Sequence, residues 1–364
     1  MIPDPRSLIP DPLSVTLSLM SLILVSSERF AEHMTPPGHP ESPERAEVMD
    51  VVAAEWRARG GEVAAPREAS REQLARVHAP EHLHRMAETA GITVALDPDT
   101  YTSPETYELA LLSAGAAVDA VERVMGGSHK RAFVLSRPPG HHAEHDRAMG
   151  FCIFNNVAVA AAHARSLGAR KVAIVDYDVH HGNGTQHIFE NDPELLYISI
   201  HQFPYYPGTG AADEIGYGAG GGRTVNLPLE VGATDEDYRE VFDGVVLPVL
   251  RQFGPDIVIV SAGFDAHERD PLGGMRVTTA AFAAMTAALR EVAEEQCSGR
   301  LVAVTEGGYD LRALGDCLRS VVDVLATEAA LPAHWPESPV ASSRGRTTVA
   351  RTTNALAQYW KFQN

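Results

Sequence analysis

The stretch KVAIVDYDVHHGNG occupies residues 171–184 and changes character near its middle. Its first part is a short, continuous apolar run of the kind that forms a strand buried on both faces. Its second part brings two aspartates and two histidines, followed by Gly-Asn-Gly. Aspartate is a poor strand residue. A buried strand that ends in carboxylates and imidazoles therefore predicts a functional site beyond its carboxyl end.

The same pattern recurs along the chain and predicts the fold class. Strand-like apolar runs also occupy 132–136, 195–201, 256–263 and 301–308, and LILVSSERF at 22–30 provides a first core strand. Amphipathic helical patterns lie between them at 105–125, 155–168, 235–253 and 278–296, and a further helix is expected from about Leu311. Alternating strands and helices predict an α/β fold with a central, mostly parallel sheet and helices on both faces.

Neither an internal repeat nor a linker divides the chain, so one domain is expected over residues 20–330. Residues 1–19 are expected to form an N-terminal extension, and 331–364 a tail that packs on the domain or extends from it. Within the tail, 336–352 is expected to be loop. The apolar run 13–25 is too short to span a bilayer. It also lacks the basic start and the small-residue cleavage site of a signal peptide.

Charge and cysteine content limit the partners. The 364 residues carry a formal net charge of −18, which argues against nucleic acid and anionic membranes as partners because both select basic surfaces. The three scattered cysteines do not suit a disulfide framework and favour a reducing cytoplasm. Self-association into a homo-oligomer is compatible with the sequence and not predicted by it.

The carboxylates and imidazoles after residue 175 suit a metal site. In an extended segment, Asp178 and His180 project to one face and can reach one ion at about 2.0–2.2 Å. Asp176 would begin about 13 Å from His180 and is better placed as a buried partner of another ligand or base. Asp265, in AGFDAHERD, is the best third ligand. Such a set suits catalytic zinc, and its oxygen content would also admit iron(II) or manganese.

Two other strand ends carry groups for acid–base chemistry. PPGHH at 138–142 places His141 and His142 together, and beside a metal one of them can act as general base and then general acid. Asp176 and Asn183 are available to fix the tautomers of these rings. EGGYD at 306–310 places Tyr309 where its hydroxyl can donate to a developing oxyanion.

Taken together, five long motifs resemble the zinc-dependent histone deacetylase family in its class II form. They are RPPGHHAEHDRAMGFCIFNN, VAIVDYDVHHGNGTQ, YISIHQFPYYPGTG, VSAGFDAHERDPLGGM and EGGYD, and GHPESPER at 38–45 is similar to the family's first-loop region. The resemblance runs from about Val25 to about Ala326 in the family's order. It implies the arginase–deacetylase fold, which agrees with the strand pattern, and makes residues 20–330 a deacetylase domain.

The resemblance also implies roles, residue by residue. The implied zinc ligands are Asp178, His180 and Asp265. His142 would be the general base and acid, and His141 its electrostatic companion paired to Asp176. Tyr309 would polarise the acyl carbonyl. The walls of a narrow lysine channel would be Gly150, Phe151 and Tyr206.

Family members also bind structural potassium, and the resemblance extends to one or two such sites. The implied inner site consists of Asp176, Asp178, His180, Ser199 and Ile200, partly through backbone carbonyls. An outer site would lie near Phe189, Asp192 and Leu195. Two departures from the class I pattern are Asn183, where some members carry Asp, and Glu306, where class I members carry glycine. Neither removes a catalytic group.

The expected activity is hydrolysis of an acetyl-lysine or related acyl-lysine amide to acetate and free amine. The substrate would be the acetylated lysine of a protein or peptide, or a small acetylated amine. Leu272 in RDPLGGM stands where polyamine-selective relatives carry Glu, which favours acetyl-lysine. Three alternatives are an acetylpolyamine amidohydrolase, an arginase-type hydrolase with two metals, and a non-catalytic protein that binds acyl-lysine.

Overall fold

The computed structural model describes residues 20–329, 333–336 and 343–362, so the extension expected over 1–19 lies outside the described residues. Its centre is one sheet in the strand order β2-β1-β3-β8-β7-β4-β5-β6, and every neighbouring pair is parallel. The strands are β1 (Met20–Ser26), β2 (Glu62–Ala64), β3 (His129–Leu135), β4 (Val172–Asp176), β5 (Leu195–Gln202), β6 (Thr224–Leu229), β7 (Ile257–Ala262) and β8 (Leu301–Thr305). The predicted parallel sheet is confirmed, with β2 and β6 as strands that the sequence pattern missed.

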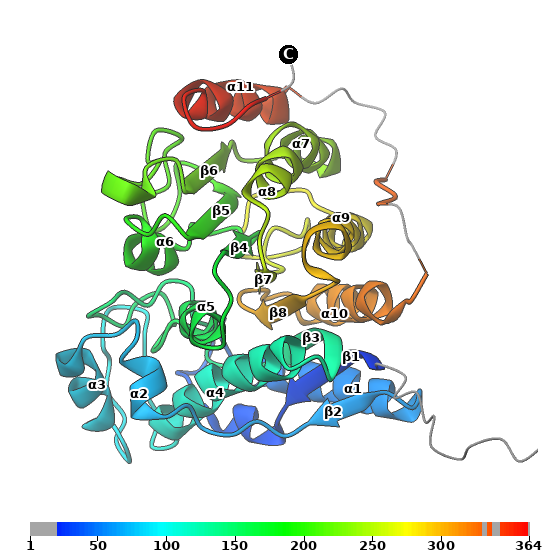
Figure 1. Ribbon diagram of the computed structural model, residues 1–364. Helices are drawn as coiled ribbons and strands as arrows, with labels where there is room; N and C mark the ends of the chain where they lie inside the picture. Colours follow the sequence, from blue (N-terminus) through cyan, green and yellow to red (C-terminus); the bar gives the residue numbers. More distant parts are fainter. Residues whose placement is uncertain (1–19, 330–332, 337–342, 363–364) are drawn as a thin grey trace, which may run out of the picture.

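Helices cover both faces of the sheet, as predicted (Figure 1). They are α1 (Glu44–Ala58), α2 (Arg71–Leu74), α3 (Pro80–Ala87), α4 (Thr106–Met125), α5 (Asn156–Ser166), α6 (Asn183–Phe189), α7 (Asp235–Val241), α8 (Leu247–Phe253), α9 (Thr279–Cys297), α10 (Leu311–Ala326) and α11 (Arg344–Leu356), with short turns η1 (Glu28–Glu32), η2 (Gly218–Gly220) and η3 (Phe242–Val246). The helix expected over 235–253 is α7 and α8 joined by the π-helical turn η3.

The two faces of the sheet have separate apolar cores. One core packs α1 and α7 to α10 against the sheet, and the other packs α2 to α6 against its opposite face. Alternate residues of β1 divide between them, because Leu22 and Leu24 join the first core while Ile23 and Val25 join the second. Burial on both faces explains why the central strands are continuous apolar runs rather than alternating patterns.

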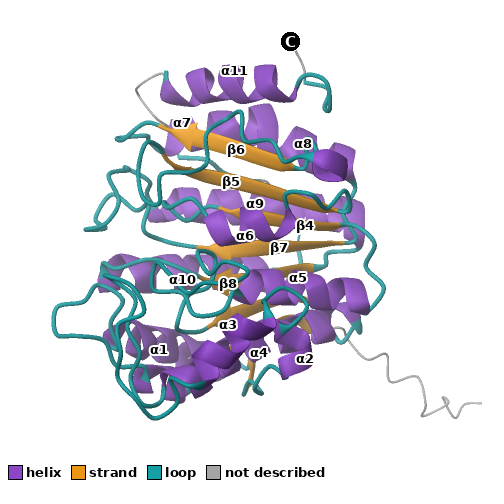
Figure 2. Ribbon diagram, turned by 90° about the vertical axis from the view of Figure 1, so that its left-hand side faces the viewer, coloured by secondary structure: helices purple, strands orange, loops and turns teal. Residues whose placement is uncertain are grey.

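The loop expected over 336–352 is wrong from Arg344 onward, because α11 begins there and lies over the edge strand β6 (Figure 2). The apolar signal is weak because much of the contact is made by threonine hydroxyls. Thr348 donates to the carbonyl of Pro228 at 2.7 Å, and Thr352 donates to the carbonyl of Asn226 at 2.8 Å. Threonines one helical turn apart thus satisfy alternate carbonyls of a strand that has no neighbouring strand on that side.

The parallel arrangement brings the polar segments that follow β3, β4, β5, β7 and β8 to one end of the sheet. Figure 2 shows long loops that extend beyond one end of the sheet.

In the part of the chain that the structure describes, no helix is both long and apolar enough to cross a membrane. The three cysteines are free and buried.

Candidate active site

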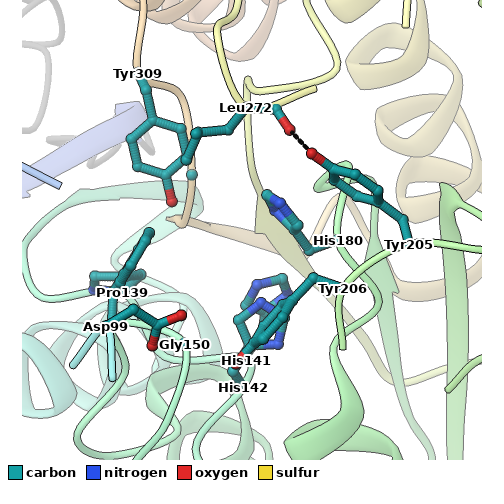
Figure 3. Close-up of a pocket in the computed structure, with 12 residues that line it drawn as sticks. Asp99, Pro139, His141, His142, Gly150, His180, Tyr205, Tyr206, Leu272 and Tyr309 are labelled. Atoms are coloured by element: carbon teal, nitrogen blue, oxygen red, sulfur yellow. Dashed lines mark hydrogen bonds between the residues drawn. The ribbon is translucent and has the colours of Figure 1, made fainter. Parts of the chain in front are cut away.

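A cavity of about 220 Å³ opens at the carboxyl end of the sheet, and it collects residues from all five of the predicted strand ends. Its lining consists of Asp99, Pro139, His141, His142, Gly150, Phe151, His180, Tyr205, Tyr206, Leu272, Gly307 and Tyr309. Figure 3 shows Tyr309 on one side of the cavity, with its hydroxyl directed inward, and the two neighbouring histidines on the opposite side. Segments more than 200 residues apart in sequence, from Asp99 to Tyr309, therefore converge on one small volume.

Three buried side chains form a potential metal site within the described residues. The ligand atoms of Asp178, His180 and Asp265 all lie within 4.8 Å of one another. Nδ1 of His180 lies 3.1 Å from Oδ1 of Asp178 and 3.1 Å from Oδ2 of Asp265. The first two residues come from the turn after β4 and the third from the turn after β7, which are neighbouring strands.

The backbone of the turn after β4 differs from the extended geometry expected for 176–180. The strand β4 ends at Asp176, and the chain then bends because side chains bond to nearby backbone groups. The Asp178 N–H donates to Asp176 at 3.1 Å, and the His180 N–H donates to Asp178 at 2.9 Å. The expected extended spacing is therefore wrong beyond β4, although Asp178 and His180 still converge.

The charges of this triad suit a divalent cation. Burial and the nearby charge of Asp178 raise the pKa of Asp265 to about 7. Burial alone would lower the pKa of His180, but its hydrogen bonds with the two carboxylates raise it to about 10. A single ring nitrogen cannot donate well to two carboxylates at once, whereas a metal ion accepts one oxygen from each together with the imidazole nitrogen. The donor set therefore fits a metal with oxygen and nitrogen ligands.

A glycine is required beside the triad. A Cβ on Gly307 would lie 2.1 Å from Oδ2 of Asp265 and 2.7 Å from Oδ2 of Asp178. The Gly307 N–H instead donates to Oδ2 of Asp178 at 2.8 Å. Gly307 thus allows the chain after β8 to pass directly against the two carboxylates.

His141 makes a hydrogen bond with a buried carboxylate. Its Nδ1 lies 2.9 Å from Oδ2 of Asp176, which also accepts from the hydroxyl of Tyr197 at 3.1 Å. Burial alone would lower the pKa of His141, but Asp176 and Asp178 raise it to about 10. The ring is therefore held as a cation by the carboxylate behind it.

His142 has a different hydrogen-bond partner and is neutral rather than cationic. Its Nδ1 lies 2.8 Å from Oδ1 of Asn183, an amide oxygen that accepts a hydrogen bond without contributing a full charge. Burial, followed by the charges of His141 and His180, lowers its pKa well below the usual range. The ring centres of His141 and His142 are only 4.0 Å apart. Because His141 carries a positive charge, a second positive charge on His142 is unfavourable, and His142 stays neutral. A neutral imidazole is the form that can accept a proton.

Aromatic rings form the walls of the cavity. The Phe151 ring centre lies 5.9 Å from that of Tyr309, and the Tyr206 ring centre lies 5.1 Å from that of His142. Phe151 adopts a positive φ of 69°, held by a bond from its N–H to the Thr100 hydroxyl at 3.0 Å. Gly150 must be glycine, because a Cβ there would lie 2.5 Å from the His142 ring. The walls suit an alkyl chain entering between aromatic faces.

Sequence reasoning missed several lining residues. Tyr205 stacks on the His180 ring at 5.5 Å, and its hydroxyl donates to the Leu272 carbonyl at 2.6 Å (Figure 3). The resemblance predicts its neighbour Tyr206, and the adjacent tyrosine in FPYYPGTG is the available signal for Tyr205. Asp99 comes from a loop far from every strand end, so no sequence pattern connected it to the site.

The residues expected to bind potassium at the inner site include Asp178 and His180 of the triad. Asp176 and Ser199 are register partners on β4 and β5, and both are fully buried. The Ser199 hydroxyl lies 2.9 Å from Nδ1 of His201. At the outer position, the carboxylate of Asp192 pairs with Arg165. Potassium binding at either place stays a prediction.

A buried triad of two aspartates and a histidine, facing a neutral imidazole and a tyrosine hydroxyl across one cavity, is the arrangement of a metal-dependent hydrolase. Sequence comparison then specifies the class. Residues 39–325 match the histone deacetylase domain, and the chain belongs to that family.

Individual relatives agree with this assignment. The chain is 41% identical to "Histone deacetylase 15" of Arabidopsis thaliana over 329 residues, covering 88% of this chain and 59% of the relative. It is 40% identical to "Polyamine deacetylase HDAC10" of Homo sapiens over 310 residues, covering 81% of this chain and 45% of that protein. The crystal structure of the HDA15 HD domain superposes with a TM-score of 0.85 at 39% identity, covering 94% of this chain and 96% of that one. The resemblance and the predicted fold are confirmed, while the chain spans about half of the length of these two curated relatives.

Proposed function

We propose that this chain is a zinc-dependent deacetylase that hydrolyses the amide of an acetyl-lysine or related acyl-lysine side chain to acetate and free amine. The observation that carries the proposal is that Tyr309 and His142 lie on opposite sides of a cavity whose lining also includes His180 of the Asp178, His180 and Asp265 triad. We assign these three residues as the zinc ligands. When bound there, zinc would polarise the acetyl carbonyl and lower the pKa of a water molecule.

The chain's own residues supply the proton transfers. Because Nδ1 of His142 faces an acceptor, its Nε2 is the free acceptor that takes a proton from the attacking water. The water oxygen bonds to the carbonyl carbon, and the Tyr309 hydroxyl donates to the oxygen that becomes negative. His142 then returns the proton to the departing nitrogen as the C–N bond breaks, which yields acetate and free amine. His141, held as a cation by Asp176, stabilises negative charge nearby.

Tyr309 is suited to act as a donor. Burial raises the pKa of its hydroxyl above the usual range, so that it remains protonated. The side chain also lies against Phe151, one of the two aromatic walls. A lysine side chain whose alkyl part runs between Phe151 and Tyr206 would present its acetyl group to both Tyr309 and His142.

A second candidate, an acetylpolyamine amidohydrolase, is favoured by one observation. Asp99 lines the cavity and offers a carboxylate that could meet a second ammonium group. Leu272, on the other side, offers only apolar contact at the position where the resemblance places Glu in polyamine-selective relatives. We favour acetyl-lysine because a neutral side chain needs no charged partner at Leu272. An arginase-type reaction would need additional aspartate ligands for a second metal, which PPGHH and Tyr309 do not supply.

The test is acetate release from acetyl-lysine peptides and from acetylspermidine, measured with the purified zinc-loaded protein. The proposal expects turnover of the peptides with a higher kcat/KM than for acetylspermidine. A higher value for acetylspermidine would establish the second candidate. Binding of acetyl-lysine peptides without any acetate release would support a non-catalytic acyl-lysine-binding protein and contradict both.

We also propose a structural potassium ion at Asp176, Asp178, His180, Ser199 and Ile200, supported by the resemblance and by the burial of these residues. Such an ion should give the protein a higher Tm in potassium chloride than in lithium chloride at equal ionic strength, and equal Tm values would contradict this proposal. Iron(II) in place of zinc, the outer potassium site, and a cytoplasmic location remain predictions from the sequence.

A further inference from the structure

A chain of hydrogen bonds continues from His142 to the outside of the site. The Asn183 amide accepts from Nδ1 of His142 through Oδ1 at 2.8 Å, and its Nδ2 donates to Oε1 of Glu144 at 2.5 Å. Beyond it, Nδ1 of His187 lies 2.9 Å and 3.0 Å from the two oxygens of Glu144. Neither Glu144 nor His187 has a role predicted from the sequence motifs.

The direction of the Asn183 amide determines the tautomer of His142. An amide presents an acceptor on one side and a donor on the other, and the two can exchange by a half turn. With Oδ1 toward His142, the ring must carry its proton on Nδ1, and Nε2 is free to accept a proton. In the reversed direction, the amide would donate to Nδ1, the ring proton would move to Nε2, and the base would be blocked.

Glu144 is the strongest influence on that direction. A carboxylate only accepts hydrogen bonds, so Nδ2 of Asn183 must face it. The other two contacts of Nδ2 are weak, because the His142 carbonyl lies 3.4 Å away and the Met149 sulfur 3.5 Å away. A hydrogen bond to a charged acceptor is roughly twice as strong as one between neutral groups.

Glu144 is itself held in place from several sides. Its side chain is buried, and its carbonyl accepts from Nδ1 of His78 at 3.0 Å. Its carboxylate forms hydrogen bonds with Asn183 and His187. These two residues are four positions apart on α6 and therefore lie on one face of that helix. Burial without a partner would be costly for a carboxylate, so these contacts define its position.

We propose that Glu144 is a positioning residue for the reaction: its carboxylate fixes the side-chain amide of Asn183 and thereby holds His142 in the tautomer that accepts a proton. This inference rests on the proposed function and extends it by one residue beyond the groups that contact substrate. The carboxylate acts through a neutral amide, so it orients the base without stabilising the imidazolium as strongly as a directly bonded carboxylate would.

The test reverses the polarity of the bond. In Asn183→Asp, two carboxylates face each other across the 2.5 Å contact, so kcat is expected to fall about 10-fold or more, as for other loss of a supporting partner, with KM and zinc content unchanged. In the double variant Asn183→Asp with Glu144→Gln, the new amide donates to the new carboxylate. The double variant is expected to recover most of the lost kcat. Arg147→Gln, an exposed side chain 3.9 Å from the Glu144 carboxylate, is the control and should match the wild type.

A second measurement keeps the proposal separate from the proposed function. The ¹⁵N shifts of the His142 ring report its tautomer without any turnover. The wild type should show a protonated Nδ1, and Glu144→Leu should shift protonation toward Nε2. An unchanged tautomer in Glu144→Leu, or a double variant no better than Asn183→Asp alone, would overturn the proposal. An inactive wild type with the expected tautomers would instead contradict the proposed function and leave this inference standing.

Discussion

The guanidinium carbon of Arg45 lies 5.0 Å from the centre of the Tyr309 ring, and the Arg45 side chain is fully buried. Arg45 also donates through Nε to the carbonyl of Gly308 at 2.8 Å, and Glu41 accepts from its Nη1 at 2.8 Å. The buried arginine therefore fixes both the ring and the backbone that presents it. A rigidly held hydroxyl is the kind of donor that stabilises a transition state.

Tyr309→Phe tests this donor. The substitution removes only the hydroxyl, so kcat should fall by roughly 10²–10³, the scale of one lost oxyanion donor. Zinc content should be unchanged, because Tyr309 is not among the assigned ligands. Tyr217→Phe, at an exposed tyrosine outside the cavity, serves as the control. Near-normal kcat in Tyr309→Phe would rule out its role.

His142→Ala tests the base. Loss of general acid–base help should lower kcat by at least about 10², since the neighbouring His141 is held as a cation by Asp176 and cannot accept the proton. The comparison is with His84→Ala, which removes an imidazole from the exposed side of α3. Steady-state turnover of an acetyl-lysine peptide measures both, and equal kcat values would show that another group accepts the proton.

Leu272→Glu tests substrate choice at the cavity mouth. A carboxylate there should attract the second ammonium group of acetylspermidine and raise its kcat/KM relative to an acetyl-lysine peptide by about 10-fold or more, corresponding to about 1.4 kcal/mol. Leu272→Gln is the matched control, because it adds similar bulk without charge. An unchanged ratio in Leu272→Glu would mean that the residue only packs the loop.

Much of this site could be predicted because its residues follow strands. Parallel strands end at one edge of the sheet, so the segments after β3, β4, β7 and β8 had to meet. Asp99 could not be predicted in this way, since it lies on a loop between α3 and α4. The links through Glu144 and Arg45 were also missed, because each depends on side-chain contacts across the fold and not on spacing along the chain.

The errors in the fold have equally physical causes. The edge strand β6 contains Pro228 and Asn226, which weaken a strand pattern but are tolerated where one side of the strand has no partner strand. The helix α11 buries threonines against that edge, so an apolar period could not reveal it. By contrast, α4 and α9 were found because their long buried faces are rich in alanine and branched apolar residues.

His78 should make folding stability depend on pH. It donates from Nδ1 to the Glu144 carbonyl and accepts the Asn155 N–H at Nε2, so protonation would destroy the acceptor. Burial and the nearby His82 lower its pKa to about 3. Between pH 6.5 and about 3, His78 is protonated in the unfolded chain but neutral in the folded protein. The free energy of unfolding should therefore fall as the pH drops from 6.5 toward 3.

His78→Gln keeps one donor and one acceptor but does not titrate. Its Tm should be lower than that of the wild type at neutral pH and should fall less steeply on acidification. The exposed His84→Gln should follow the wild-type curve. If wild type and His78→Gln lost the same Tm between neutral and acid pH, His78 would not contribute to acid sensitivity.

The central claim is that Asp178, His180 and Asp265 hold the ion on which amide hydrolysis depends. The most direct measurement is a zinc titration of chelator-stripped protein, with bound metal and acetate release from an acetyl-lysine peptide followed together. Activity should rise with zinc and level off near one ion per chain, and the exposed Glu268→Ala should behave identically. Asp265→Ala should bind no zinc at that stoichiometry and lose about 10³-fold or more in kcat/KM, since Lewis-acid help is worth several kcal/mol. Wild-type zinc occupancy and turnover in Asp265→Ala would contradict the account.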